Sequence, residues 1–337
     1  MEAGTEKYRP RWLDLFESGE LGRRAAAAAA LASACRLCPR GCGAARADGA
    51  AGACGASSVH KALVASVLPH FGEESPLVGS RGSGAVFFGG CGLRCVFCQN
   101  YQISQPPDND FAAAGVTELS AGELAGRFLE LQQAGCHNLN LVTAASHLPA
   151  VLEALDTAAR SGFRLPVVYN SGGYESPQCL ELLDSVVDVY LPDMKFGGAG
   201  AAARLAEGPD YVAVNRRTIK EMFRQVGLLE TGREGLARQG LIVRHLVLPN
   251  DLSGTREVLE FLAREVSPKV HLSLMAQYYP THRVQDSPQL LRPITETEYE
   301  KARELLEEFG FENGWVQMLQ SSDTYRPDFS RPDPFSP

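Results

Sequence analysis

Short apolar runs alternate with longer amphipathic stretches from residue 85 onward, and this alternation limits the possible folds more than any other feature of the chain. Six runs of strand character lie at 85–88, 138–142, 166–169, 187–191, 241–248 and 270–274. Six stretches of helical periodicity lie between and after them, at 121–133, 148–159, 177–185, 215–226, 254–265 and 296–309. The pattern predicts an α/β protein with a parallel sheet and right-handed crossovers. Its spacing fits an open doubly wound sheet or a curved partial barrel.

The composition is that of a globular protein, with 45% hydrophobic and 21% charged residues. A net charge of −8 gives no basic footprint for nucleic acid. No run approaches the ~20 apolar residues of a membrane span. The alanines at 25–30 predict a helix rather than an export signal, because acidic residues precede them. We therefore expect a cytoplasmic protein with no membrane association and no evident nucleic-acid partner, although the overall charge does not exclude a local basic patch.

Four segments are expected along the chain. Residues 1–34 form a helical segment broken around Pro10 and the following glycines, and residues 35–84 form an irregular cysteine-rich module. Residues 85–320 form the core that carries the βα units. The tail at 321–337 is too rich in proline for regular structure, so we expect it to lie across the surface or to be partly disordered.

The chain contains nine cysteines, which in a reducing compartment bind metal more often than they form disulfides. Cys136 and Cys179 stand alone in helical or helix-edge contexts, so we expect them to be buried and to behave as small apolar residues. The others fall into two groups, the upstream cysteines Cys35, Cys38, Cys42 and Cys54, and a downstream triplet at Cys91, Cys95 and Cys98.

The triplet lies in the cysteine loop, residues 90–100 (GCGLRCVFCQN), directly after the first predicted strand. Loops at the carboxyl ends of parallel strands form the active sites of barrels. Zinc bound by three cysteines usually recruits a fourth ligand nearby, whereas the next histidine is the distant His137. Thiolates favour iron–sulfur clusters, and three of them leave one iron of a four-iron cube open. A 4Fe–4S cluster is therefore favoured over zinc or unligated thiols.

The upstream cysteines lie in a segment without an apolar core, which suggests that a metal supplies folding energy there. Their number and spacing fit either zinc or a second iron–sulfur cluster. The motif GSRGSG at 79–84 precedes a strand rather than linking a strand to a helix, so it predicts a plain turn and not a phosphate loop.

The Cys-X3-Cys-X2-Cys pattern, with an aromatic residue before its third cysteine, resembles the signature of the radical S-adenosylmethionine (SAM) superfamily over roughly residues 85–320. The chain further resembles pyruvate formate-lyase activating enzymes and their relatives in the segments CRLCPRGC (35–42), NLVTAASH (140–147), VVYNSGGYE (167–175), DVYLPDMKF (188–196) and RHLVLPN (244–250). The resemblance implies a partial (β/α)6 TIM-like barrel of the radical SAM type, preceded by the cysteine-rich metal-binding module.

The resemblance also implies an oxidoreductase in which a reduced 4Fe–4S cluster cleaves SAM to a 5′-deoxyadenosyl radical for hydrogen abstraction. Its electron donor would be a flavodoxin or ferredoxin, and its partner a glycyl radical enzyme. Two alternatives remain open, namely a radical SAM enzyme that modifies a small molecule or peptide, and a non-catalytic metal-binding or electron-transfer protein.

Three charged residues are expected to be catalytic. Asp193 and Lys195 follow the fourth predicted strand on one side of the chain and match the Asp-X-Lys of the activating enzymes. They are expected to hold the SAM carboxylate or a cation, or else to form a solvated ion pair. Arg244 lies in an apolar strand, so it must be paired or face a polar cavity, and it matches an activase arginine near SAM. Its neighbour His245 should point the opposite way and pack on a helix.

Further residues are expected to contact the cofactors. Gly90 lets the backbone approach the cluster, and Phe97 shields it from water. The segment TAASH stands where many superfamily members carry Gly-Gly-Glu, so Thr143 and Ser146, or backbone carbonyls, are expected to hold the SAM amino group. His147 either reaches the site or starts the next helix. The remaining candidates are Asn170 and Ser171, which match an Asp-Thr pair or form a turn before two glycines, and Gln277, which ends the sixth strand.

Overall fold

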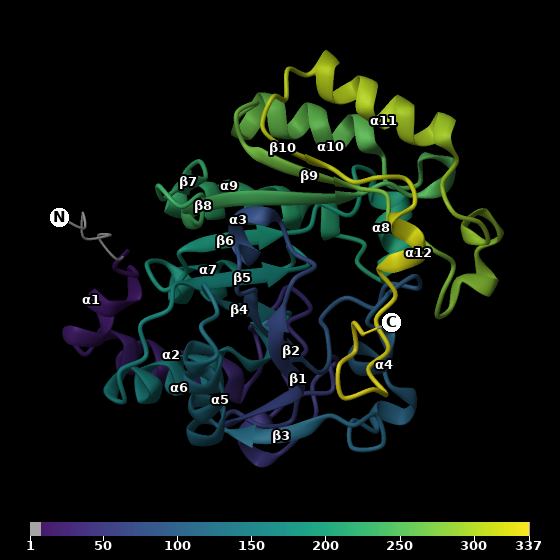
Figure 1. The fold of residues 1–337 in the computed structure, drawn as a ribbon. Coiled ribbons are helices and arrows are strands. Elements are labelled where there is room, and N and C mark those ends of the chain that lie inside the picture. Colours follow the sequence, from purple (N-terminus) through teal and green to yellow (C-terminus); the bar gives the residue numbers. More distant parts are fainter. Residues whose placement is uncertain (1–7, 337) are drawn as a thin grey trace.

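Parallel strands form the centre of one open sheet in the computed structural model, which describes residues 8–336. They are β2 (Ser83–Phe88), β4 (Leu139–Val142), β5 (Val167–Ser171), β6 (Val189–Pro192), β8 (Ala237–Leu246), β9 (His271–Met275) and β10 (Gly314–Val316). The strand order is β10-β9-β8-β6-β5-β4-β2-β1-β3, so successive parallel strands are neighbours (Figure 1). The prediction of an α/β protein is confirmed, and the six predicted strand runs correspond to β2, β4, β5, β6, β8 and β9. The strand β10 was not predicted, and it forms one edge of the sheet while β3 forms the other.

Helices follow the strands where helical periodicity predicts them. They are α5 (Ala121–Gln133), α6 (Leu148–Arg160), α7 (Pro177–Leu183), α9 (Tyr211–Val226), α10 (Thr255–Phe261, continued by a π-helical turn at Leu262–Val266) and α11 (Glu296–Glu308). Capping boxes start α5 and α11, with Ser120 paired to Glu123 and Thr295 to Glu298. The helix α8 (Ala199–Ala206) was not predicted.

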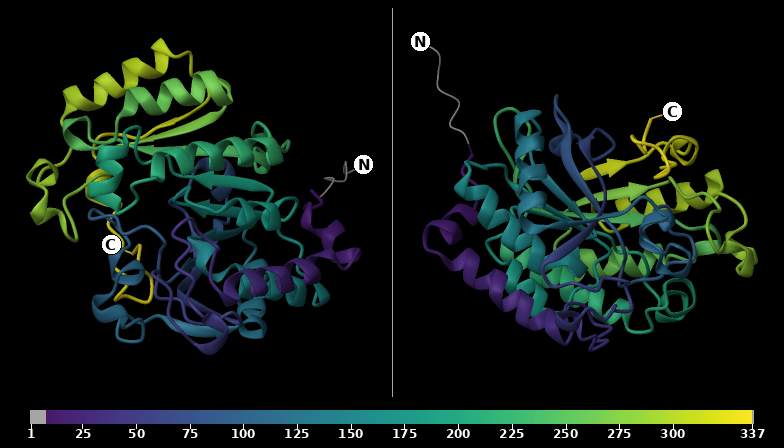
Figure 2. Two further views of the ribbon diagram at one scale, coloured as in Figure 1. Left: turned by 180° about the vertical axis from the view of Figure 1, so that it is seen from behind. Right: turned by 90° about the horizontal axis from the view of Figure 1, so that it is seen from below.

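The helices α1 (Trp12–Glu17) and α2 (Glu20–Ser33) precede the sheet, and the predicted break lies at Gly19, whose φ is 70°. The helix α2 packs on α6, while α10 and α11 lie together at the β9–β10 end of the sheet (Figures 1 and 2). Shorter helices are α3 (Ser75–Val78), α4 (Tyr101–Ser104) and α12 (Ser321–Thr324), with 3-10 turns at Arg46–Asp48, Pro107–Asn109, Ala144–His147, Pro249–Asp251, Val284–Asp286 and Pro288–Leu290.

The prediction that residues 35–84 are irregular throughout is wrong at β1 (Lys61–His70). This strand pairs antiparallel with β2 on one side and with β3 (Thr117–Ser120) on the other. Burial does not alternate along it, because three of its four buried residues lie together at 62–64 and the fourth is His70. Pairing with strands distant in sequence therefore decides its conformation, as is common for strands. A two-residue strand, β7 (Glu230–Thr231), pairs antiparallel with β8.

The tail is more ordered than its prolines suggest. The turn of α12 contradicts the prediction that residues 321–337 contain no regular structure. Beyond it, Phe329 and Phe335 pack on the end of β2, with ring centroids 5.5 and 5.2 Å from that of Phe87. The Phe335 ring also lies 4.2 Å from that of His70 at the end of β1. Among residues 8–336, no helix has the length and apolar character needed to cross a bilayer.

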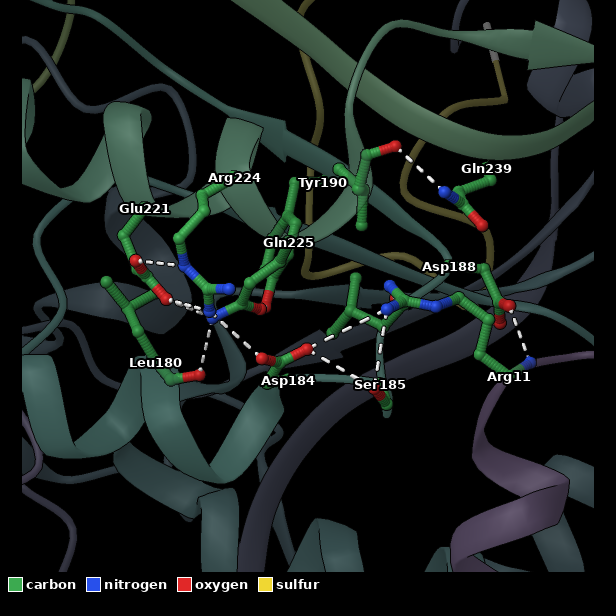
Figure 3. A network of polar contacts seen from close by, with 12 residues as sticks. Arg11, Leu180, Asp184, Ser185, Asp188, Tyr190, Glu221, Arg224, Gln225 and Gln239 are labelled. Atoms are coloured by element: carbon green, nitrogen blue, oxygen red, sulfur yellow. Dashed lines mark hydrogen bonds and ion pairs between the residues drawn. The ribbon is translucent and has the colours of Figure 1, made fainter.

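A buried carboxylate joins the N-terminal segment to the sheet. Asp188, just before β6, accepts hydrogen bonds from the backbone N–H groups of Arg11 (2.9 Å) and Val167 (2.8 Å). The hydroxyl of Tyr8 donates a third, at 2.7 Å. Burial raises the pKa of Asp188 to about 6, so the group is ionised at pH 7.5. Figure 3 shows the Arg11 side chain reaching on to Ser185.

Replacing Asp188 with alanine is expected to lower the free energy of unfolding by about 2–4 kcal/mol, because buried N–H groups lose their acceptor. Urea unfolding followed by circular dichroism measures the change. The control Asp14→Ala removes an exposed carboxylate on α1, paired with Arg9, and should cost less than about 1 kcal/mol. Equal costs for the two variants would show that Asp188 does not join these segments.

Candidate active site

A cavity of about 390 Å³ lies at the carboxyl ends of the parallel strands. Residues from the ends of β2, β4, β5, β6, β8, β9 and β10 border it, together with the segment after β1 and the tail. The cysteine loop, which follows β2, enters this cavity. Parallel α/β sheets place their sites at this end of the strands because the connecting loops converge there.

All three cysteines of the triplet line the cavity. The sulfur of Cys91 accepts a hydrogen bond from the N–H of Leu93 at 3.4 Å, and the sulfur of Cys98 lies 3.3 Å from the Ser104 hydroxyl. Burial raises the pKa of Cys91 and of Cys95 to about 12. In the metal-free protein these thiols are therefore protonated at neutral pH, and binding a metal there must release protons.

Among residues 8–336, no group of three or more His, Cys, Asp or Glu side chains is arranged to hold a single metal ion. Ligands of one ion must converge on one point, whereas the cysteines of a four-iron cube each bind a different iron. The loop offers three thiols that border one cavity, and no fourth cysteine borders it. This set of donors fits a four-iron cube better than it fits a single metal ion with four protein ligands.

Asp193 and Lys195, which follow β6, form an ion pair on the cavity wall. Their side chains are only 23% and 22% exposed, so they differ from a solvated surface pair. Burial alone lowers the pKa of Lys195, but the charge of Asp193 outweighs it and the pKa is raised. The Lys195 backbone N–H also donates to the Tyr211 hydroxyl at 3.0 Å. The geometry therefore holds a permanent cation beside the three thiols.

Arg244 on β8 also borders the cavity and is paired, as its position in an apolar strand requires. Its partners are Glu73 and Glu74, in the segment between β1 and α3. The Arg244 Nε donates to Glu74 at 2.9 Å, and its Nη2 donates to both carboxylates. The arginine side chain is 14% exposed and the two glutamates 6% and 5%, so the three charges are almost fully buried.

Sequence reasoning missed Glu73 and Glu74. Glu73 also accepts hydrogen bonds from the side-chain amides of Asn140 on β4 and Asn170 on β5, at 3.0 and 3.2 Å. This carboxylate thus links three parallel strands at the floor of the cavity. The one available signal was Arg244 itself, because a buried cation demands an anion, although the sequence did not indicate which one.

The predicted cofactor-contacting residues divide into two sets. Those that line the cavity are Phe97, Thr143, Asn170, Ser171 and Gln277. Thr143 adopts a left-handed conformation with φ of 64°, and its N–H donates to the Asn170 carbonyl at 2.8 Å. Gln277 is held by hydrogen bonds with Gln99 and Gln317, both at 2.9 Å.

Ser146 is buried but is not among the residues that border the cavity. His147 lies behind the cavity wall, where its Nε2 pairs with the Gly89 carbonyl at 2.8 Å. Burial lowers the pKa of His147 to about 4, so the ring is neutral and supports the base of the cysteine loop. Gly90 has a φ of 76° and packs against the backbone at Cys54. His245 packs on α10 through Thr255, as predicted.

The upstream cysteines come together behind the cysteine loop, away from the cavity lining. The isolated Cys136 and Cys179 are buried among apolar residues, as predicted. Residues 79–81 form a turn between α3 and β2, which confirms the interpretation of GSRGSG.

Comparison with known proteins gives one informative match. No family model matches the chain. The chain is similar to "Uncharacterized protein MJ0674" of Methanocaldococcus jannaschii, with 32% identity over 244 residues, or 72% of this chain. The aligned region spans 66% of that protein, just under two thirds of its length. Because the name of this relative states no activity, the geometry of the cavity carries the functional argument.

Proposed function

We propose that this chain is a radical SAM enzyme built on a partial (β/α)6 barrel. The observation that carries the proposal is that three cysteines spaced as in that superfamily border one cavity with a buried ion pair and a buried arginine. The neighbouring order of β2, β4, β5, β6, β8 and β9 supports the partial barrel. The cavity volume of about 390 Å³ lies within the usual range for small-molecule sites, about 300–1,000 Å³.

Each side chain has a task that its position suits. Cys91, Cys95 and Cys98 would hold a 4Fe–4S cluster, and SAM would supply the ligand that a fourth cysteine otherwise provides. When bound, the cluster and SAM supply a 5′-deoxyadenosyl radical that abstracts a hydrogen atom from the substrate. Lys195, fixed by Asp193, provides a cation for the SAM carboxylate. Buried Phe97 helps to exclude water from the three sulfurs.

Arg244 and its two partners, Glu73 and Glu74, form a buried charged triad on the cavity lining that can orient the far end of a bound molecule. Thr143, Asn170 and Ser171 offer hydroxyl and amide groups along the wall. The resemblance to activating enzymes favours a glycyl radical enzyme as the substrate, with a flavodoxin or ferredoxin as the electron donor. Hydrogen abstraction from a small molecule or free peptide would use the same residues, and a glycyl-radical EPR signal on a candidate partner distinguishes the two.

Reductive cleavage of SAM tests the proposal. The protein is purified without oxygen, its iron and sulfide are restored, and dithionite and SAM are added. We expect methionine and 5′-deoxyadenosine in equal amounts, measured by liquid chromatography, and neither product without dithionite. A protein that keeps its iron but forms no 5′-deoxyadenosine would instead be a non-catalytic metal-binding or electron-transfer protein.

A further inference from the structure

The upstream cysteines come together although 18 residues of the chain lie between Cys35 and Cys54. The Cys35 and Cys42 side chains lie close enough to interact. A Cβ placed on Gly52 would lie 3.5 Å from the Cys42 sulfur and 3.6 Å from the Cys54 sulfur, so these two sulfurs face the same stretch of backbone. Cys38 lies close enough to Cys35, Cys42 and Cys54 to interact with each of them electrostatically. Four thiols thus share one small volume.

A buried arginine with an unpaired N–H points to an anion at this place. Arg46 is 2% exposed, and its Nη1 lies 3.8 Å from the Cys35 sulfur. Its Nη2 donates to the Ser58 carbonyl at 2.5 Å, while its buried Nε has no partner among the described residues. A buried guanidinium beside neutral thiols is costly, whereas thiolates bound to a metal would compensate its charge.

The upstream cysteines also touch the cysteine loop. A Cβ on Gly92 would lie 3.3 Å from the Cys38 sulfur, and one on Gly90 would lie 2.2 Å from the Cys54 carbonyl oxygen. Arg40, between Cys38 and Cys42, donates to the Gly92 carbonyl. The upstream cysteines therefore pack directly against the backbone of the loop that carries the triplet.

Exposure changes across the upstream group. Cys35 is buried, Cys38 and Cys54 are half-buried, and Cys42 is exposed at the surface. The group therefore reaches from solvent to the back of the cysteine loop, which is the position that a relay of electrons requires. Zinc does not change its redox state and would make no use of this position, whereas an iron–sulfur cluster would.

We propose that Cys35, Cys38, Cys42 and Cys54 hold a second iron–sulfur cluster that receives the electron needed at the cysteine loop. This inference rests on the proposed function, because that function defines where the electron goes. A reduced flavodoxin or ferredoxin loses one electron and is oxidised, the second cluster is reduced, and the electron then passes to the cluster held by the triplet. No bond is formed or broken in the transfer.

Metal analysis of anaerobically purified wild type, Cys38→Ser/Cys42→Ser and Cys98→Ala tests the site. Each variant should hold about half the iron and sulfide of the wild type, because each loses one of two similar clusters. Like the wild type, and unlike Cys98→Ala, the double variant should keep an EPR signal that changes when SAM is added. Its SAM cleavage should persist with dithionite but be lost with reduced flavodoxin. The circular dichroism spectrum and melting temperature of each variant show whether it is folded.

The outcomes separate this inference from the proposed function. Wild type with stoichiometric zinc, and a double variant that loses zinc but no iron, would overturn the second cluster while leaving the radical SAM proposal standing. Iron lost only from the double variant, and not from Cys98→Ala, would overturn the proposed function instead. A double variant with half the iron but full flavodoxin-dependent turnover would overturn the electron-entry role. The single variant Cys42→Ser, at an exposed position, repeats the test if the double variant is unfolded.

Discussion

Replacing Cys98 with alanine is expected to lower the formation of 5′-deoxyadenosine by about 100-fold or more, since even indirect changes at a metal site cost about 10–100-fold. Cys98 borders the cavity beside Ser104, and its loss leaves only two thiols to hold a cube that needs three. Product formation and the iron bound at the cysteine loop should fall together. Both are measured on the same anaerobic preparation.

The matched control is Cys136→Ala. Cys136 is also buried, but it lies in the apolar core and does not border the cavity. This variant should keep the iron content and the SAM cleavage of the wild type. If Cys98→Ala kept full turnover, or if both variants lost it equally, the triplet would not be the catalytic metal site.

Replacing Arg244 with methionine is expected to lower the free energy of unfolding by about 3–5 kcal/mol, because it leaves two buried carboxylates without their cation. Burial raises the pKa of Glu74, but Arg244 outweighs burial and the pKa is lowered below its usual value. The Arg244–Glu74 pair therefore stabilises the wild type at pH values above the usual pKa of glutamate, and this stabilisation is lost as the pH falls through the lowered pKa of Glu74. In the variant burial is opposed only by the smaller effects of hydrogen bonds from the backbone and from Ser273, so the pKa of Glu74 rises and the variant loses stability as the pH increases.

The deficit of Arg244→Met relative to the wild type should consequently be larger at pH 8 than at pH 5, as measured by urea unfolding at both values. The control Arg256→Met breaks an exposed pair with Glu308 at 2.6 Å and should cost less than about 1 kcal/mol at either pH. Similar costs for the two arginines, or a deficit that does not depend on pH, would show that the triad is not a buried charged unit.

The elements with strong periodicity could be predicted from the sequence. The strands β2, β4 and β6 are buried along their whole length. Their continuous apolar character therefore indicates a position in the middle of a sheet that is covered on both faces. The helices α5 and α11 also carry capping signals at their starts. The cysteine loop was placed at the cavity because it follows the first parallel strand, and that argument needs only chain order.

The missed features depend on contacts between distant segments. The strand β1 is specified by pairing with β2 and β3, and its own residues give little alternation. Glu73 and Glu74 reach the cavity only because β1 brings the following segment beneath Arg244. The place of Phe335 against Phe87 likewise depends on how the tail crosses the end of β2. The local sequence pattern does not indicate where these segments lie, because contacts between residues far apart in the chain determine their positions.

The EPR spectrum of the dithionite-reduced, anaerobically purified protein, recorded with and without SAM, tests the central claim most directly. We predict the signal of a reduced 4Fe–4S cluster that changes when SAM is added, because SAM binds the iron that no cysteine holds. This component should be absent from Cys98→Ala. Zinc without iron at Cys91, Cys95 and Cys98, or a signal that SAM leaves unchanged, would contradict the account.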